Sequence, residues 1–156
     1  MRSFLQEIWP QLIADTQLIV EDTKVPLSTN YYNFKPIKID GPLVDINLGI
    51  NINGDGDDSH KTFALKQKCT SWMCKTAMKP YDEVITAILL RAWHLAGPAV
   101  KVFVGGDWEN WENWENWENW ENWENWENWE KACKVFKKLW PDDELPGPLK
   151  QIMAKI

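Results

Sequence analysis

The sequence lacks a long apolar run. No stretch approaches the ~18 consecutive apolar residues that a transmembrane helix requires, so we expect no membrane span. Near the N-terminus, Arg2, Glu7, Pro10 and Asp15 interrupt the apolar segment that a secretory leader would need. These two absences predict a soluble protein of the cytoplasm.

Cysteines are also few, because the chain has only Cys69, Cys74 and Cys133. An odd number of cysteines without a leader is typical of a reducing compartment, so we expect free thiols. Cys69 and Cys74 have no second pair of ligands at zinc-binding spacing, and the sequence therefore does not favour a zinc site.

Recognisable catalytic motifs are missing as well. The chain has no glycine-rich phosphate loop, no G-x-S-x-G and no Cys–His pair with a plausible third member. We therefore expect a binding protein rather than an enzyme.

What the sequence has in excess is tryptophan. Twelve of the 156 residues are Trp, and eight of these belong to one tract, residues 108–130, in which Trp-Glu-Asn repeats without error. The tract also carries eight glutamates, so the formal charge of −6 becomes +2 when the tract is left out. The acidity and the tryptophan content thus belong to the tract and do not describe the rest of the chain.

We interpret the tract as an insertion into one domain formed by residues 1–107 and 131–156. Removing six units, 18 residues, leaves 138 residues with every expected element intact. The error-free repeat indicates copying without selection, by replication slippage, by design or in a generated sequence. Glu is a good helix former, and Glu130 and Lys134 are spaced as an i,i+4 ion pair, so we predict a helix through the tract.

The tryptophans of the tract are candidate binding residues. In a helix they circle the axis, so no single face is apolar, and the glutamates oppose docking on an anionic membrane. Exposed aromatic rings favour a protein partner or self-association through this arm. The candidate residues are Trp108, Trp111, Trp114, Trp117, Trp120, Trp123 and Trp126.

Apolar residues recur at helical spacing in the body of the chain. One helix is expected over residues 3–22, with a kink or a second start at Pro10. Another is expected over residues 82–96, where Gly97 and the following proline supply a stop. The last helix, which extends the tract, has apolar residues on one flank and a solvated basic face on the other, so we expect no nucleic-acid partner; the basic residues are Lys131, Lys134, Lys137 and Lys138.

A period of two predicts strands over residues 37–39, 43–53, 63–65 and 100–104. In the second of these, Val, Ile or Leu occupies every other position. The resulting order, α-β-β-β-α-β-α, predicts a single α+β domain in which helices cover the apolar face of an antiparallel meander.

The loop between the second and third expected strands contains the chain's carboxylate–histidine cluster, Asp55, Asp57, Asp58 and His60. Its spacing follows the start of a calcium loop, but Thr62 occupies the position of the bidentate glutamate. A hairpin loop with glycine at positive φ is the simpler interpretation, so we expect no cofactor. The alternative is a divalent cation at this loop, which would make the protein a metal-dependent hydrolase.

One resemblance adds to this interpretation. The stretch C-K-T-A-M-K-P-Y-D at residues 74–82, with G-D-G-D-D-S-H at 54–60 upstream and G-D-W at 106–108 downstream, resembles a group of small, uncharacterised phage and bacterial proteins. The resemblance spans about residues 40–110 and brings no catalytic residues with it. It implies a phage-associated protein of the cytoplasm that binds and blocks a host factor, such as a defence nuclease.

The sequence thus leads to three hypotheses. The first is a non-catalytic cytoplasmic binding protein, either a phage-type inhibitor or a synthetic or generated sequence on such a template. The second is a metal-dependent hydrolase centred on Asp55, Asp57 and His60. The third is a self-assembling structural protein that uses the tryptophan-rich arm.

Overall fold

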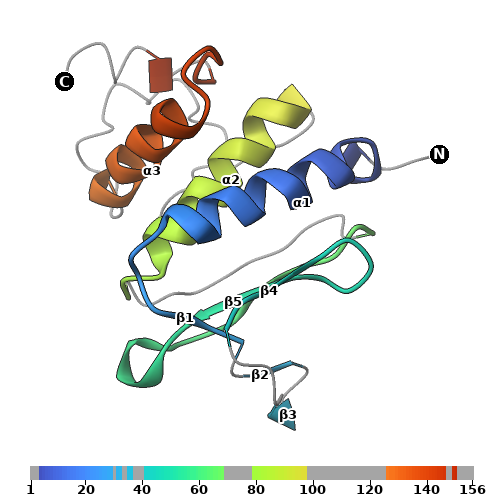
Figure 1. Ribbon diagram of the computed structural model, residues 1–156, viewed down its shortest axis with the longest axis vertical. Coiled ribbons are helices and arrows are strands. Elements are labelled where there is room, and N and C mark those ends of the chain that lie inside the picture. The colour runs from blue at the N-terminus through green and yellow to red at the C-terminus, as the bar shows by residue number, and fades with distance from the viewer. Residues whose placement is uncertain are drawn as a thin grey trace, which may run out of the picture.

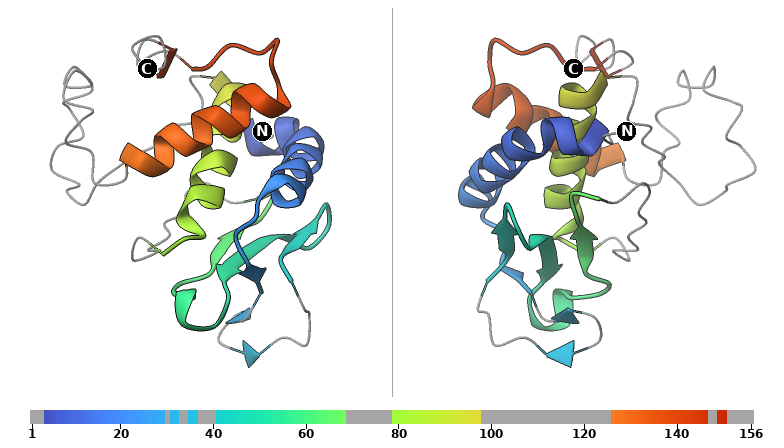
Figure 2. Two further views of the ribbon diagram at one scale, coloured as in Figure 1. Left: turned by 60° about the vertical axis from the view of Figure 1, so that its left-hand side comes forward. Right: turned by 90° about the vertical axis from the view of Figure 1, so that its right-hand side faces the viewer.

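The computed structural model shows one α+β domain, as predicted. It describes residues 4–29, 31–32, 35–36, 41–68, 79–97, 126–146 and 149–150. Within these residues, three α-helices lie on one side of an antiparallel sheet, while a small β2–β3 hairpin lies beyond the sheet on the side away from the helices (Figures 1 and 2). The strands expected over 37–39 and 100–104 fall outside the described residues.

Helix α1, Phe4–Asp22, confirms the first expected helix. It is one helix that continues through Pro10, so a second helix does not start there. The ring of Pro10 is exposed, whereas Leu5, Trp9 and Leu12 are buried against the rest of the domain. Packing of this apolar face offsets the loss of one backbone hydrogen bond at the proline.

The prediction of one strand over residues 43–53 is wrong, because the chain reverses within that stretch. Strand β4, Leu43–Asp45, pairs with β5, Gly49–Gly54, across a three-residue turn. The Asp45 carboxylate accepts hydrogen bonds from the backbone N–H groups of Asn47 and Leu48, at 2.8 and 2.7 Å. Gly49 follows with φ of 103°, a conformation that favours glycine. Local turn chemistry therefore overrides the alternating pattern.

Strand β5 is the centre of the sheet. It pairs with β4, with β1, Leu27–Ser28, and with β6, Phe63–Leu65, and all three pairings are antiparallel. The third expected strand is thereby confirmed. The register pairs Ile50 with Leu65 and Ile52 with Phe63, and these four side chains are at most 1% exposed, so they form the apolar face that the helices cover. The remaining small hairpin pairs β2, Tyr31–Tyr32, with β3, Lys35–Pro36.

Helix α2, Asp82–Ala96, has the predicted bounds and the predicted glycine stop at Gly97, whose φ is 58°. It lies between α1 and α3, Trp126–Leu139, and so it is buried on most of its surface (Figure 2). Even Thr86 and Arg91, which an amphipathic helix would expose, are buried. A central helix packs against other elements on several sides, and α3 covers one side of α2.

Candidate functional site

The loop that carries Asp55, Asp57, Asp58 and His60 forms a single turn of 3₁₀-helix, η1, Gly56–Asp58, on the surface. All four side chains are exposed. In the part of the chain that the structure describes, no three His, Cys, Asp or Glu side chains gather into a group that could hold a metal ion. The metal site stays a prediction, and added Mg²⁺, Mn²⁺, Ca²⁺ or Zn²⁺ tests it, because a bound ion raises the melting temperature.

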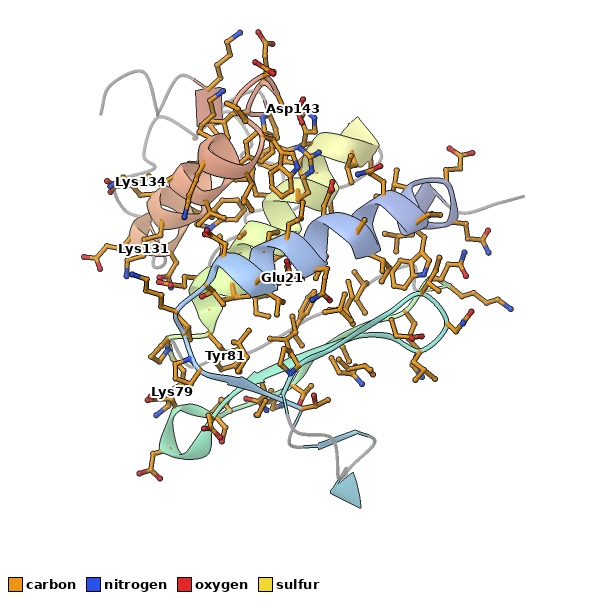
Figure 3. All side chains as sticks on the ribbon, viewed as in Figure 1. Glu21, Lys79, Tyr81, Lys131, Lys134 and Asp143 are labelled. Atoms are coloured by element: carbon orange, nitrogen blue, oxygen red, sulfur yellow. The ribbon has the colours of Figure 1, made fainter. Side chains whose placement is uncertain are left out.

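Hydrogen bonds from outside the loop fix its shape. The buried Asn53 amide donates to the carbonyl of His60 at 2.9 Å and to the hydroxyl of Thr62 at 3.0 Å, and its oxygen accepts from the N–H of His60 at 3.0 Å. From the segment before α2, the Tyr81 hydroxyl donates to the carbonyl of Lys61 at 2.6 Å, and Lys79 donates to that of Asp57 at 2.9 Å (Figure 3). Asn53 therefore has a structural role, because its hydrogen bonds hold the two ends of the loop together.

Most of the candidate tryptophans, Trp108, Trp111, Trp114, Trp117, Trp120 and Trp123, fall outside the described residues. Trp126 is the first residue of α3. The last tryptophan of the tract, Trp129, is only 3% exposed and belongs to the hydrophobic core. The end of the tract is therefore part of the domain.

Each of the last three residues of the tract, Asn128, Trp129 and Glu130, has a partner in the structure. Trp129 is buried, Asn128 donates from its amide to the buried Asp82 carboxylate at 2.6 Å, and Glu130 forms the predicted ion pair with Lys134 at 3.2 Å. Asp82 begins α2, where a carboxylate is favourable. The hydrogen bond from Asn128 to Asp82 links the start of α3 to the start of α2.

The basic face of α3 is solvated, as expected, and its lysines have internal partners. Lys131 lies 3.4 Å from Glu83, Lys138 pairs with Asp22, and Lys137 donates to the carbonyl of Asp143 at 2.9 Å. Figure 3 shows Lys131 and Lys134 projecting from the outer side of α3. Such exposed pairs contribute at most about 1 kcal/mol each to stability.

A network around Arg91 was not foreseen from the sequence. The buried guanidinium donates to Asp15 at 2.6 Å and to Asp143 at 2.8 Å, and its carbon lies 3.9 Å from the centre of the Trp140 ring. The side chain of His94 is 26% exposed, and its Nδ1 atom lies 2.9 Å from the carbonyl oxygen of Glu144. The network joins α1 and α2 to the segment that follows α3, and these partners compensate the buried charge of Arg91.

The hydrogen bond from Arg91 is the main reason that the pKa of Asp143 lies below its usual value. The nearby charges of Arg91, His94 and Lys137 act in the same direction. Elsewhere in α3, burial and, to a smaller extent, the charge of Glu130 raise the pKa of the Cys133 thiol to about 12. Cys133 is a free thiol and stays protonated at neutral pH, so it is not a nucleophile.

The turn between β4 and β5, residues 46–48, is the most apolar exposed feature of the described surface. Large hydrophobic side chains are exposed at three described positions, and two of them are Ile46 at 49% and Leu48 at 58%; the third, Leu18, lies on α1. We call Ile46, Asn47 and Leu48 the hairpin tip.

The hairpin tip is held rigidly despite its exposure. In addition to the two hydrogen bonds that the Asp45 carboxylate accepts, the Trp9 indole N–H donates to the carbonyl of Ile46 at 2.8 Å. A Cβ at Gly49 would lie 2.6 Å from the carbonyl oxygen of Leu65, so this position requires glycine. The sequence signal for this turn was present, since Asp and Asn followed by Gly favour turns, but the alternating apolar pattern concealed it.

The second surface feature is a groove between the end of α1, the start of α2 and α3. Its volume is about 280 Å³. Apolar side chains of Ile19, Val84, Ala87 and Val135 line it, together with charged side chains on the rim. A site of this size accommodates one large side chain rather than a whole cofactor.

No family model matches the chain, and searches among curated proteins and among solved structures find no match. Among the described residues, no helix has the length and the apolarity needed to cross a membrane. The assignment of function therefore depends on the geometry of the two surface features.

Proposed function

We propose that this chain is a non-catalytic protein-binding module whose recognition element is the hairpin tip. The observation that carries the proposal is the combination of exposure and rigidity at Ile46 and Leu48. Exposed aliphatic side chains cost solvation free energy in the unbound protein, and a fixed backbone reduces the ordering entropy that binding must overcome. Both properties favour a surface that is buried in a complex.

The tip is the turn that ends the β4–β5 hairpin, so a concave apolar site on another protein suits it. About half of each of these residues is exposed, so burying what remains contributes about 1 kcal/mol each, which suits a hot spot within a larger interface. A membrane surface is a poorer complement, because the tip lacks the aromatic and basic residues that interfacial segments use.

The resemblance of residues 40–110 to small phage and bacterial proteins supports a host factor as the partner, with a defence nuclease as one example. Inhibition would then consist of the tip occupying an apolar cleft of that factor. A cytoplasmic setting belongs to the same proposal, and the free thiol of Cys133 supports it.

The test is a capture experiment with full-length protein on a solid support and a bacterial lysate, read by mass spectrometry. The test variant carries Ile46→Ser with Leu48→Ser, and the matched control carries Leu18→Ser, which removes the third exposed hydrophobic side chain. We expect the parent protein and the control to retain the same partner and the tip variant to lose it. Equal capture by all three proteins, or capture of nothing specific by the parent, would refute the proposal.

A further inference from the structure

The groove between α1, α2 and α3 is a second binding feature, separate from the hairpin tip. Its apolar floor is described above, and its rim carries Lys24, Lys131 and Lys138 against Asp22 and Glu83. The rim therefore has a net charge of +1, whereas the Trp-Glu-Asn tract has one carboxylate in every unit and no basic residue.

The lysines on the rim can exchange their present carboxylate partners for those of a ligand. Lys131 and Lys138 form ion pairs within the domain, but their side chains are 58% and 67% exposed. Exposed pairs of this kind contribute at most about 1 kcal/mol, so an incoming carboxylate competes with Glu83 or Asp22 at little cost.

The volume of the groove limits the size of the side chain that can bind in it. A volume of about 280 Å³ suits one bulky side chain, and an indole ring on an aliphatic floor is a favourable occupant. In the tract, a glutamate follows each tryptophan. The indole of one unit can thus contact the apolar floor of the groove while the neighbouring carboxylate pairs with a lysine of the rim.

The end of the tract, Trp129 and Glu130, shows how this domain binds a tryptophan that is followed by a glutamate. Trp129 packs into the core, while Glu130 pairs with Lys134 of α3. The chain then runs along α3 from the tract toward the groove residues Lys131, Val135 and Lys138. Residues 108–125 contain six units, and this groove holds one of them, so at least five units of each tract are left for the grooves of other copies.

We propose that the groove binds a Trp-Glu-Asn unit of residues 108–125 from a second copy of this chain. The contact is heterologous, since a groove on one molecule receives a tract from the next, and it generates open chains of molecules rather than a closed dimer. Each single contact is weak, but several equivalent units in one tract raise the occupancy of a groove.

Sedimentation velocity of the full chain over a range of concentrations tests this proposal. The groove variant carries Lys24→Glu with Lys138→Glu, which reverses two charges on the rim. The matched control carries Lys68→Glu with Lys150→Glu, which reverses two exposed lysines elsewhere, one of them also paired, to Glu144. Urea unfolding of both variants establishes that each is folded.

We expect the parent protein and the control to form larger species as concentration rises, and the groove variant to associate on the order of tenfold more weakly. A synthetic (Trp-Glu-Asn)₄ peptide added to the parent protein should dissociate the larger species. A parent protein that remains monomeric at every concentration overturns the proposal, as does a groove variant that associates like the control. Either result leaves the capture experiment on the hairpin tip unaffected.

Discussion

The α3 side of the domain and the hairpin tip treat apolar side chains in opposite ways. Around α3, Trp129, Cys133 and Phe136 are at most 3% exposed and the charges are paired. At the tip, the backbone is fixed by hydrogen bonds, while Ile46 and Leu48 project into solvent. A segment whose backbone is fixed by hydrogen bonds therefore need not belong to the core. Buried side chains such as Trp129 stabilise the fold, whereas exposed ones such as Ile46 are available for binding.

The largest expected effect is on the α3 side. Trp129→Ala should lower the free energy of unfolding by about 3–5 kcal/mol, because a buried indole leaves a cavity. Chemical denaturation measures the loss. The control is removal of six units, 18 residues, which retains Trp129 and every described contact. That deletion should change stability by about 1 kcal/mol or less, and a loss as large as that of Trp129→Ala would contradict the division between tract and domain.

The Arg91 network should come next. Asp15→Ala leaves the buried Arg91 guanidinium with Asp143 as its remaining carboxylate partner, so we expect a loss of about 3 kcal/mol. Asp22→Ala is the matched control on the same helix, because it breaks the exposed pair with Lys138 and should cost about 1 kcal/mol or less. Urea titration of both variants compares them directly, and equal losses would mean that burial of the pair is not decisive.

A substitution at Gly49 tests whether the turn between β4 and β5 requires glycine. Gly49→Ala places a Cβ against the Leu65 carbonyl at a φ of 103°, so we expect a loss of about 1–3 kcal/mol. Gly56→Ala is the control, because Gly56 also has a positive φ, 55°, but nothing lies within 4 Å of the added carbon. Thermal unfolding should show the larger effect at Gly49.

The smallest of these effects depends on pH. Since the folded-state pKa of Asp143 is lowered, its stabilisation is present above the ordinary value of about 3.9 and is lost as pH falls through the lowered value. Asp143→Asn should therefore reduce stability near neutral pH and flatten the acid limb of the stability curve. Asp142→Asn, at an exposed neighbour, should leave that limb unchanged. Melting temperatures across the acid range distinguish the two variants.

The helices could be predicted from the sequence because their apolar residues recur at the helical period and their ends carry clear signals, as at Asp82 and Gly97. The turn at residues 46–48 was missed because its apolar side chains continue the alternation of the flanking strands. An exposed Ile46 is indistinguishable from a buried one until the chain reversal is known.

The Arg91 network and the role of Asn128 could not be foreseen for a different reason. Asp15, Arg91 and Asp143 are far apart in the sequence and meet only when the helices pack. Asn128 is chemically identical to every other asparagine of the tract, and its position opposite Asp82 alone distinguishes it. Tertiary contacts of this kind carry no local pattern.

Urea unfolding of the variant with Ile46→Ser and Leu48→Ser, beside Leu18→Ser, tests the central contrast most directly. The account predicts that both variants keep the parent free energy of unfolding within about 0.5 kcal/mol, because exposed side chains away from special features contribute little to stability. A loss of about 2 kcal/mol or more in the tip variant alone would contradict it, since Ile46 and Leu48 would then belong to the fold rather than to a binding surface.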